Sequence, residues 1–156
     1  MKKNIFLIAT LCAVLIFAGC RKESKNNRPL GTVERPSWSI SDDYDYSSSM
    51  TAIVRVDIYN PGIAYSDAKM FSDNDLLAAF CNNVCIGVAE PEDDLFYLYI
   101  IPPEGEATSK MITLRYYSDA LQCIFEAKDV FEYMSDARYG TVSEPFNPLF
   151  TLVSAK

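Results

Sequence analysis

The side chains best suited to covalent or metal chemistry in this 156-residue chain are its five cysteines, and the sequence contains no histidine. Without an imidazole, a cysteine lacks the usual neighbour that lowers its pKa and makes it a nucleophile. Cys81 and Cys85 have the spacing of a metal-binding pair, but the further cysteine or histidine ligands that zinc requires are lacking. We therefore expect neither a catalytic cysteine nor a zinc site.

A structural disulfide suits these cysteines better, because the leader described below directs the chain to an oxidising compartment. If Asn82-Asn83 forms a two-residue turn, Cys81 and Cys85 project from opposite faces of a hairpin and cannot bond to each other. A three-residue loop would instead place them opposite each other. We expect Cys123 to pair with Cys81 or Cys85, and buried free thiols are the alternative.

Three acidic clusters, at residues 42–45, 73–75 and 90–94, could bind a cation. Calcium takes carboxylate and carbonyl oxygens from such loops, and Asp73 and Asp75 are the best candidates. The spacing of an EF-hand is missing, so solvated turns are the more ordinary explanation. Paired carboxylates could also hydrolyse a glycosidic bond. Because nothing in the sequence indicates a cleft, we expect no enzymatic activity and no cofactor.

Aromatic residues offer a candidate ligand face, and all ten tyrosines lie between residues 44 and 139. Tyr97 and Tyr99 alternate within an apolar run, so their rings would share one face of a strand. Trp38, Tyr44 and Tyr46 lie in a polar segment and are expected to be exposed. Such rings stack on sugars and concentrate at protein interfaces. Core packing is the alternative for the tyrosines of the strands.

The first twenty residues predict an export signal. Two lysines precede an apolar run, residues 5–18, that is shorter than the ~20 residues of a membrane span. The sequence Phe-Ala-Gly-Cys at 17–20 resembles a bacterial lipobox, which implies lipidation of Cys20 and attachment to a membrane by acyl chains. Arg21 stands where a lipoprotein retained in the inner membrane would carry Asp. The resemblance therefore implies the outer membrane, with the periplasmic or surface side left open.

Charge is divided unevenly along the rest of the chain. Residues 21–35 carry five bases and two acids, and residues 36–156 carry seven bases and nineteen acids, a net charge of −12. Basic residues with Asn, Pro and Gly predict a flexible tether over residues 21–37. An acidic domain would repel phosphates, so we expect no binding to nucleic acid.

Short alternating or apolar runs separated by turn residues predict an all-β domain over residues 38–153. An antiparallel β-sandwich, immunoglobulin-like or jelly-roll-like, is the expected architecture. Residues 121–134 fit either a helix or two strands. The expected strands are Met50–Ile58, Leu76–Phe80, Val84–Ala89, Leu95–Ile101, Lys110–Tyr117 and Leu149–Val153.

A series of motifs resembles a recurrent β-rich module of exported and lipid-anchored proteins of Bacteroidetes. The similarity covers about residues 36–152, with departures at Ile86, where the module has Arg, and at an inserted Ser118. It favours strands over residues 121–134. The motifs are Trp38, Ser-Ser-Ser-Met-Thr at 47–51, Asp-Leu-Leu-Ala-Ala-Phe at 75–80, Cys-Ile-Gly-Val-Ala at 85–89, Thr-Leu-Arg-Tyr-Tyr-Ser-Asp-Ala at 113–120 and Gly-Thr before Pro145.

The module implies an interaction or structural domain outside the cytoplasm, with no activity attached. Together with Cys20, it leads us to expect a lipid-anchored outer-membrane protein that makes protein contacts in the envelope or at the cell surface. A carbohydrate-binding lipoprotein that uses the exposed aromatic residues is the alternative.

Overall fold

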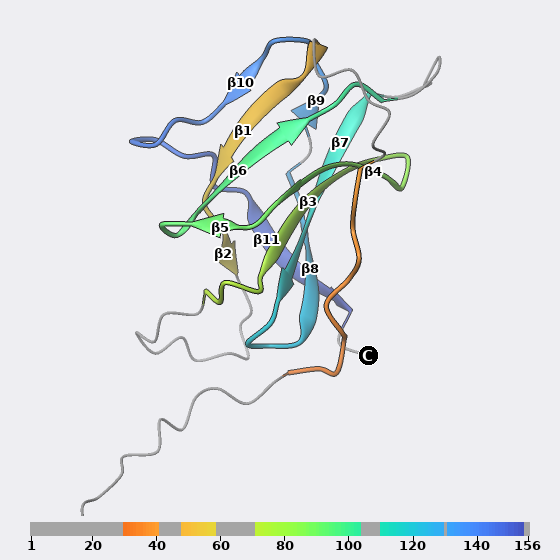
Figure 1. Cartoon of the computed structure of the whole chain (residues 1–156), viewed down its shortest axis with the longest axis vertical. Helices are drawn as coiled ribbons and strands as arrows, with labels where there is room; N and C mark the ends of the chain where they lie inside the picture. The colour runs from red at the N-terminus through yellow and green to blue at the C-terminus, as the bar shows by residue number, and fades with distance from the viewer. Residues whose placement is uncertain (1–29, 41–47, 59–70, 104–109, 130, 155–156) are drawn as a thin grey trace, which may run out of the picture.

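The protein folds into two β-sheets that face each other, and no helix occurs in the part of the chain described. The computed structural model describes residues 30–40, 48–58, 71–103, 110–129 and 131–154 (Figure 1). The prediction of an all-β sandwich is therefore confirmed. The predicted leader, residues 1–20, and the acidic cluster at 42–45 lie outside the described residues.

Within the described residues, the smaller sheet has four strands and the larger has seven. In the four-stranded sheet the order is β10 (Arg138–Tyr139), β1 (Met50–Val54), β6 (Leu95–Ile100) and β5 (Pro91–Glu92). In the seven-stranded sheet the order is β2 (Asp57–Ile58), β11 (Leu149–Ser154), β8 (Cys123–Ala127), β7 (Met111–Ser118), β3 (Leu76–Cys81) and β4 (Val84–Ala89), with β9 (Phe131–Glu132) also pairing with β7.

At two places the chain passes directly from a strand of one sheet to a strand of the other. The predicted strand Met50–Ile58 divides into β1 and β2, which belong to different sheets, although the alternation of buried residues continues through Val56. In the same way β4 leads into β5 on the other sheet. Strands that change sheets at such corners are typical of sandwiches whose layers cross at a steep angle.

The pairing is mainly antiparallel, as predicted, but it includes two short parallel pairs that were not expected. β1 pairs with β10 in parallel, and β11 pairs with β2 in parallel. Both pairs involve two-residue strands reached by long connections, which no local pattern in the sequence encodes. The sheets are therefore mixed. Residues 121–134 form β8 and β9, so strands replace the predicted alternative of a helix.

The core lies between the inward faces of the two sheets. One residue of every two on β1 and β6 is buried there, opposite the inward side chains of β3, β7, β8 and β11. Tyr116 lies at the centre, with its ring about 6 Å from those of Phe96, Phe125 and Phe150. Burial of large aromatic surfaces of this kind is the main stabilising contribution in a domain of this size.

Two local features of the motifs have clear physical causes. Asn82 and Asn83 both adopt positive φ, at 49° and 66°, and make the two-residue turn predicted between β3 and β4. Gly87 lies where β4 crosses β6, and a Cβ atom there would come within 2.7 Å of the Tyr99 carbonyl oxygen. Glycine thus allows the two sheets to approach each other closely at this corner.

Residues 30–40, named the strap here, cross the outer face of the seven-stranded sheet. Figure 1 shows this segment in orange, on the side of the molecule away from β10 and β1. Its first part is held by hydrogen bonds from the amides of Leu30, Gly31 and Val33 to the carbonyls of Leu121 and Gln122. The prediction of a flexible tether over 21–37 is therefore wrong for residues 30–37, and the domain begins by residue 30 rather than 38.

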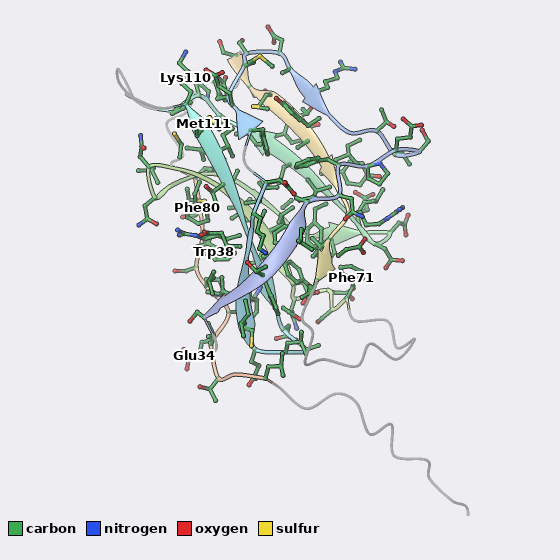
Figure 2. The ribbon with its side chains drawn as sticks, turned by 180° about the vertical axis from the view of Figure 1, so that it is seen from behind. Glu34, Trp38, Phe71, Phe80, Lys110 and Met111 are labelled. Carbon is green, nitrogen blue, oxygen red and sulfur yellow. The ribbon has the colours of Figure 1, made fainter. Side chains whose placement is uncertain are left out.

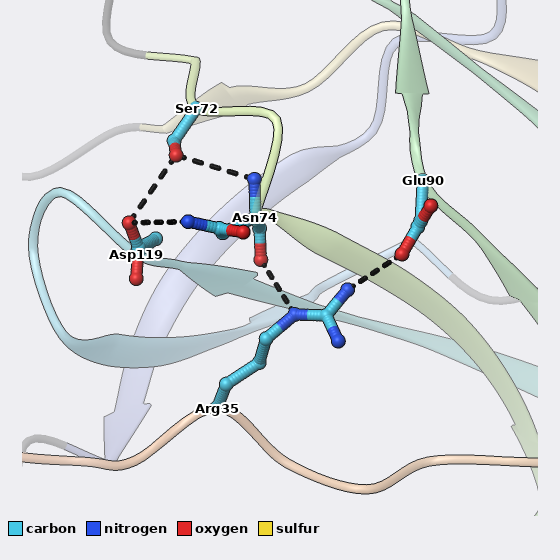
Figure 3. Close-up of polar contacts among 5 residues, drawn as sticks. All are labelled: Arg35, Ser72, Asn74, Glu90 and Asp119. Atoms are coloured by element: carbon cyan, nitrogen blue, oxygen red, sulfur yellow. Dashed lines mark hydrogen bonds and ion pairs between the residues drawn. The ribbon is translucent and has the colours of Figure 1, made fainter.

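The middle of the strap is fastened by Arg35. Its guanidinium donates to the Asn74 carbonyl oxygen at 2.9 Å and forms an ion pair with Glu90 at 2.7 Å (Figure 3). Asn74 in turn contacts Ser72 and Asp119. The cationic residues that made residues 21–37 look like a solvated linker thus include one that fixes the segment to the domain.

Candidate ligand-binding groove on the four-stranded sheet

The outer face of the four-stranded sheet, named the open face here, carries the tyrosine pair that the sequence singled out. β6 alternates so that Phe96, Leu98 and Ile100 point into the core, whereas Tyr97 and Tyr99 point outward. Tyr99 is 61% exposed, and Tyr97 is partly exposed. The prediction that the two rings share one face is confirmed, and the alternative of core packing is excluded for Tyr99.

Cross-strand pairing arranges the open face in two rows. Thr51 of β1 pairs with Arg138 of β10 on one side and with Tyr99 of β6 on the other, and Ile53 pairs with Tyr97. Neighbouring strands lie about 4.8 Å apart, and residues two apart on a strand are about 6.6 Å apart. The two rings, one guanidinium and one hydroxyl therefore occupy an area about the size of two sugar rings.

These rows form the floor of a groove of about 550 Å³. The loop after β10 forms one wall. The volume is in the range typical of small-ligand sites. The lining residues are Thr51, Ala52, Ile53, Tyr97, Leu98, Tyr99, Arg138, Gly140, Thr141 and Val142, and none of these is acidic.

The wall of the groove depends on Gly140. This residue has a φ of 74°, and a Cβ atom there would press on the Phe146 amide nitrogen and lie 2.5 Å from the Ile53 carbonyl oxygen. The close approach allows the Phe146 amide to donate to Ile53 at 2.8 Å. A tight turn follows, in which the amides of Thr141 and Glu144 both donate within residues 141–144. The turn therefore holds Thr141 and Val142 at the edge of the groove that they line.

Trp38, predicted to belong to the same ligand face, lies elsewhere. It is part of the strap, and its ring packs edge-on against Phe80 with 5.5 Å between centroids (Figure 2). The Arg115 guanidinium lies 4.4 Å from the centre of the same Phe80 ring. Trp38 therefore covers the outer face of the seven-stranded sheet. Tyr44 and Tyr46, the other predicted members of the ligand face, lie outside the described residues.

Asp75, predicted as a calcium ligand, is a buried structural residue. Its Oδ1 accepts from the Asp119 amide at 2.8 Å, and its Oδ2 accepts from the Tyr116 hydroxyl at 2.6 Å and the Ser72 amide at 3.1 Å. Burial raises the pKa of this carboxyl, although the hydrogen bond from Tyr116 and the two amides oppose the rise.

The calcium prediction is therefore wrong for Asp75, because protein donors already occupy both of its oxygens. Asp73 is exposed on the neighbouring turn. No group of three or more acidic or cysteine side chains that could hold a metal ion occurs among the described residues.

The predicted disulfide does not form, and none of Cys81, Cys85 and Cys123 takes part in a disulfide. Phe80, beside Cys81 and paired with Cys85, lies opposite Thr113 of β7, whereas Cys123 lies opposite Ser118 of the same strand. Five residues of strand separate these positions by about 17 Å, far beyond the ~7 Å limit between bonded Cα atoms.

The alternative, buried thiols outside any disulfide, is the one observed for Cys81 and Cys123, and Cys85 is a partly buried thiol. The two-residue turn also holds Cys81 and Cys85 apart, as the hairpin geometry predicted. Burial raises the pKa of all three thiols, which disfavours the reactive thiolate.

The sequence did not predict the polar residues that line the groove together with the tyrosines. Arg138 and Thr141 come from a two-residue strand and a loop far along the chain, and no periodic signal marks them. Thr51 and Ile53 could have been found, because they occupy the outward positions of the alternating run that begins at Met50.

Comparisons with protein-family models, with curated proteins and with solved structures find no match for this chain. Among the residues described, none forms a helix long and apolar enough to cross a bilayer.

Proposed function

We propose that this protein is a lipid-anchored outer-membrane protein whose β-sandwich binds carbohydrate, without enzymatic activity, in the groove of the open face. The sequence supports the anchor through the lipobox-like residues that end at Cys20. The observation that supports the binding site is the pair of outward tyrosines in a groove with threonine and arginine side chains. The sequence alone favours protein contacts, whereas the groove favours a sugar.

The chemistry of the groove suits a pyranose ring. The flat face of a sugar presents C–H bonds that carry partial positive charge, and the face of a tyrosine ring is negative. Thr51, Thr141 and the two tyrosine hydroxyls can exchange hydrogen bonds with sugar hydroxyls. The spacing of about 6.6 Å between Tyr97 and Tyr99 allows each ring to contact a separate residue of one chain.

Binding is tested by affinity electrophoresis of the full-length protein in detergent, through gels that contain xylan, starch, a β-glucan or polygalacturonate. At least one polysaccharide should slow the wild type, and the double variant Tyr97→Ala/Tyr99→Ala should migrate freely. Leu152→Ala is the control, because Leu152 is an exposed apolar residue of β11, outside the groove. Unchanged migration in every gel, or retention of the double variant, would contradict the proposal.

The anchor has its own test. Wild-type protein should fractionate with the outer membrane, and Cys20→Ala should lose that association, because the acyl chains would be missing. Protease treatment of intact cells would then show on which side the domain lies. A Cys20→Ala protein that still fractionates with the membrane would contradict lipid anchoring while leaving the groove untouched.

Protein contact is the second candidate, and exposed apolar residues on β11 favour it. Leu149, Leu152 and Val153 are 38%, 41% and 53% exposed on this strand. Exposed apolar side chains that lie close together are common at protein interfaces. Crosslinking in cells from position 152 should capture an envelope partner if this candidate is correct, and a crosslink pattern identical to that from an exposed polar position would exclude it.

A further inference from the structure

We propose that the groove selects acidic polysaccharides, and that Arg138 recognises the carboxylate of a uronic acid residue. This inference rests on the proposed function and specifies its ligand class. It follows from the charges around the open face rather than from the tyrosines.

The first observation is the different pairing of the four arginines in the described residues. Arg35 and Arg115, on the side of the seven-stranded sheet, form ion pairs with Glu90 and Glu126 at 2.7 and 2.9 Å. Arg138, in the groove, has no hydrogen bond or ion pair between its side chain and any other described residue, and it is exposed. The same is true of Arg55, which directly follows β1.

The second observation is that none of the described residues lining the groove is acidic, in a region of the chain that carries nineteen acids against seven bases. An arginine on such a surface would ordinarily find a carboxylate nearby. Here the guanidinium, with its rigid fork of donors, keeps its bidentate capacity for a carboxylate from outside.

The third observation is the position of Arg138 relative to the rings. Arg138, Thr51 and Tyr99 lie in one row across three neighbouring strands. Two strand spacings, about 10 Å, separate the Cα atoms of Arg138 and Tyr99. A sugar ring stacked on Tyr99 can therefore direct a carboxylate on its C5 carbon toward the guanidinium, while the next sugar of the chain lies on Tyr97.

The domain's net charge explains why the recognition would be local. An acidic polymer is repelled by the overall field of the protein, so binding requires both a stacking surface and a cation that is not already neutralised. Salt screens the ion pair at Arg138 and the overall repulsion alike. We therefore expect the loss of affinity caused by Arg138→Gln to become smaller as ionic strength rises.

The test uses matched pairs of polymers with the full-length protein in detergent. Polygalacturonate, alginate and hyaluronan are each compared with their carboxyl-reduced forms, in which the same sugar linkages carry a hydroxymethyl group instead of a carboxylate. Wild type should bind the acidic form of at least one polymer about tenfold more tightly than its reduced form. Arg138→Gln should abolish that preference, and Arg138→Lys should retain part of it.

Lys128→Gln is the control for charge alone. Lys128 is exposed after β8 and is not part of the groove, and this change removes the same single positive charge. It should leave the tenfold preference intact. If Lys128→Gln and Arg138→Gln reduce binding equally, the effect is nonspecific and the inference is wrong.

The remaining outcomes separate the inference from the function on which it rests. Suppose that wild type binds acidic and reduced polymers equally, that Tyr97→Ala/Tyr99→Ala loses this binding, and that Arg138→Gln keeps it. That result overturns acid selection, and the proposed sugar site remains supported. Tighter binding of the reduced forms overturns acid selection as well. If the protein binds none of the acidic, reduced or neutral polymers, both the acid selection and the proposed sugar-binding function are overturned.

Discussion

The two outer faces of this sandwich are treated in opposite ways. The outer face of the seven-stranded sheet is covered by the strap: Phe80 is buried beneath Trp38, and Arg115 is paired with Glu126. The open face of the four-stranded sheet has no such cover among the described residues, and there Tyr99 is exposed and Arg138 unpaired.

The difference shows which aromatic residues stabilise the fold and which are available for binding. On the covered face an aromatic ring and a cation are satisfied by each other and by their neighbours, so mutation should affect stability. On the open face the same residue types find no such partners among the described residues, so mutation should affect binding with little effect on stability.

The largest effect is expected from Phe80→Ala on the covered face. The ring is 6% exposed and contacts both Trp38 and Arg115, so its loss should lower the free energy of unfolding by about 3 kcal/mol. Tyr99→Ala on the open face should cost less than about 1 kcal/mol. Urea denaturation of both variants measures this. Equal losses would mean that the open face is as much a part of the stabilising structure as the covered one.

A second large effect is expected where the open face depends on backbone geometry. Gly140→Ala places a Cβ atom against the backbone of Ile53 and Phe146 at a positive φ, and it should cost about 2 kcal/mol. Because the turn that follows carries Thr141 and Val142, polysaccharide binding should weaken as well. Thermal unfolding and affinity electrophoresis are measured together, and a variant with full binding would show that the turn does not shape the groove.

A pH-dependent effect of about 1–2 kcal/mol is expected from Asp75→Asn, since the amide cannot accept all three hydrogen bonds. Burial raises the folded-state pKa of Asp75 above the unfolded value of 3.8. The stability that this shift contributes is therefore fully present below pH 3.8 and is lost as pH rises through the folded-state pKa. The difference in unfolding free energy between wild type and variant should shrink from pH 3.5 to pH 7. A difference that grows over this range would contradict the assignment.

The smallest effect is expected from Arg35→Gln. The ion pair with Glu90 is exposed, so its loss should cost no more than about 1 kcal/mol, and less in 1 M salt. Hydrogen exchange at Gly31 and Val33 should increase more than the global stability falls, because the strap loses its central attachment. Arg55→Gln is the matched change on the open face and should leave both quantities unchanged.

The sequence predicts those parts of the fold that depend on local patterns. Two adjacent asparagines tolerate positive φ, so the turn at Asn82-Asn83 could be predicted, and the alternation of β6 placed Tyr97 and Tyr99 on one face. The sheet that each strand joins could not be predicted, because β1 and β2 continue one alternating pattern but pair with different strands. Trp38 was misplaced for a related reason, since only the packed fold shows that Trp38, although it lies in a polar segment, covers Phe80.

The sequence predicts the aromatic residues of the candidate site but not its arginine. Tyr97 and Tyr99 follow the two-residue alternation of a strand, which the sequence reveals. Arg138 lies in a two-residue strand and is placed beside Thr51 only by a parallel pairing. The same limit explains the cysteines, because the separation of Cys123 from Cys81 depends on the register of β7 with two neighbours.

We expect the open face to bind ligand and the covered face not to bind it. The most direct measurement is an NMR titration of the isotope-labelled full-length protein with the best-bound polysaccharide, as a short oligosaccharide. Shifts should be concentrated at the groove residues, with Trp38 and Phe80 unchanged; the groove residues to follow are Thr51, Ile53, Tyr97, Tyr99 and Arg138. Shifts centred on Trp38 and the strap, with the tyrosines of β6 unaffected, would contradict this expectation.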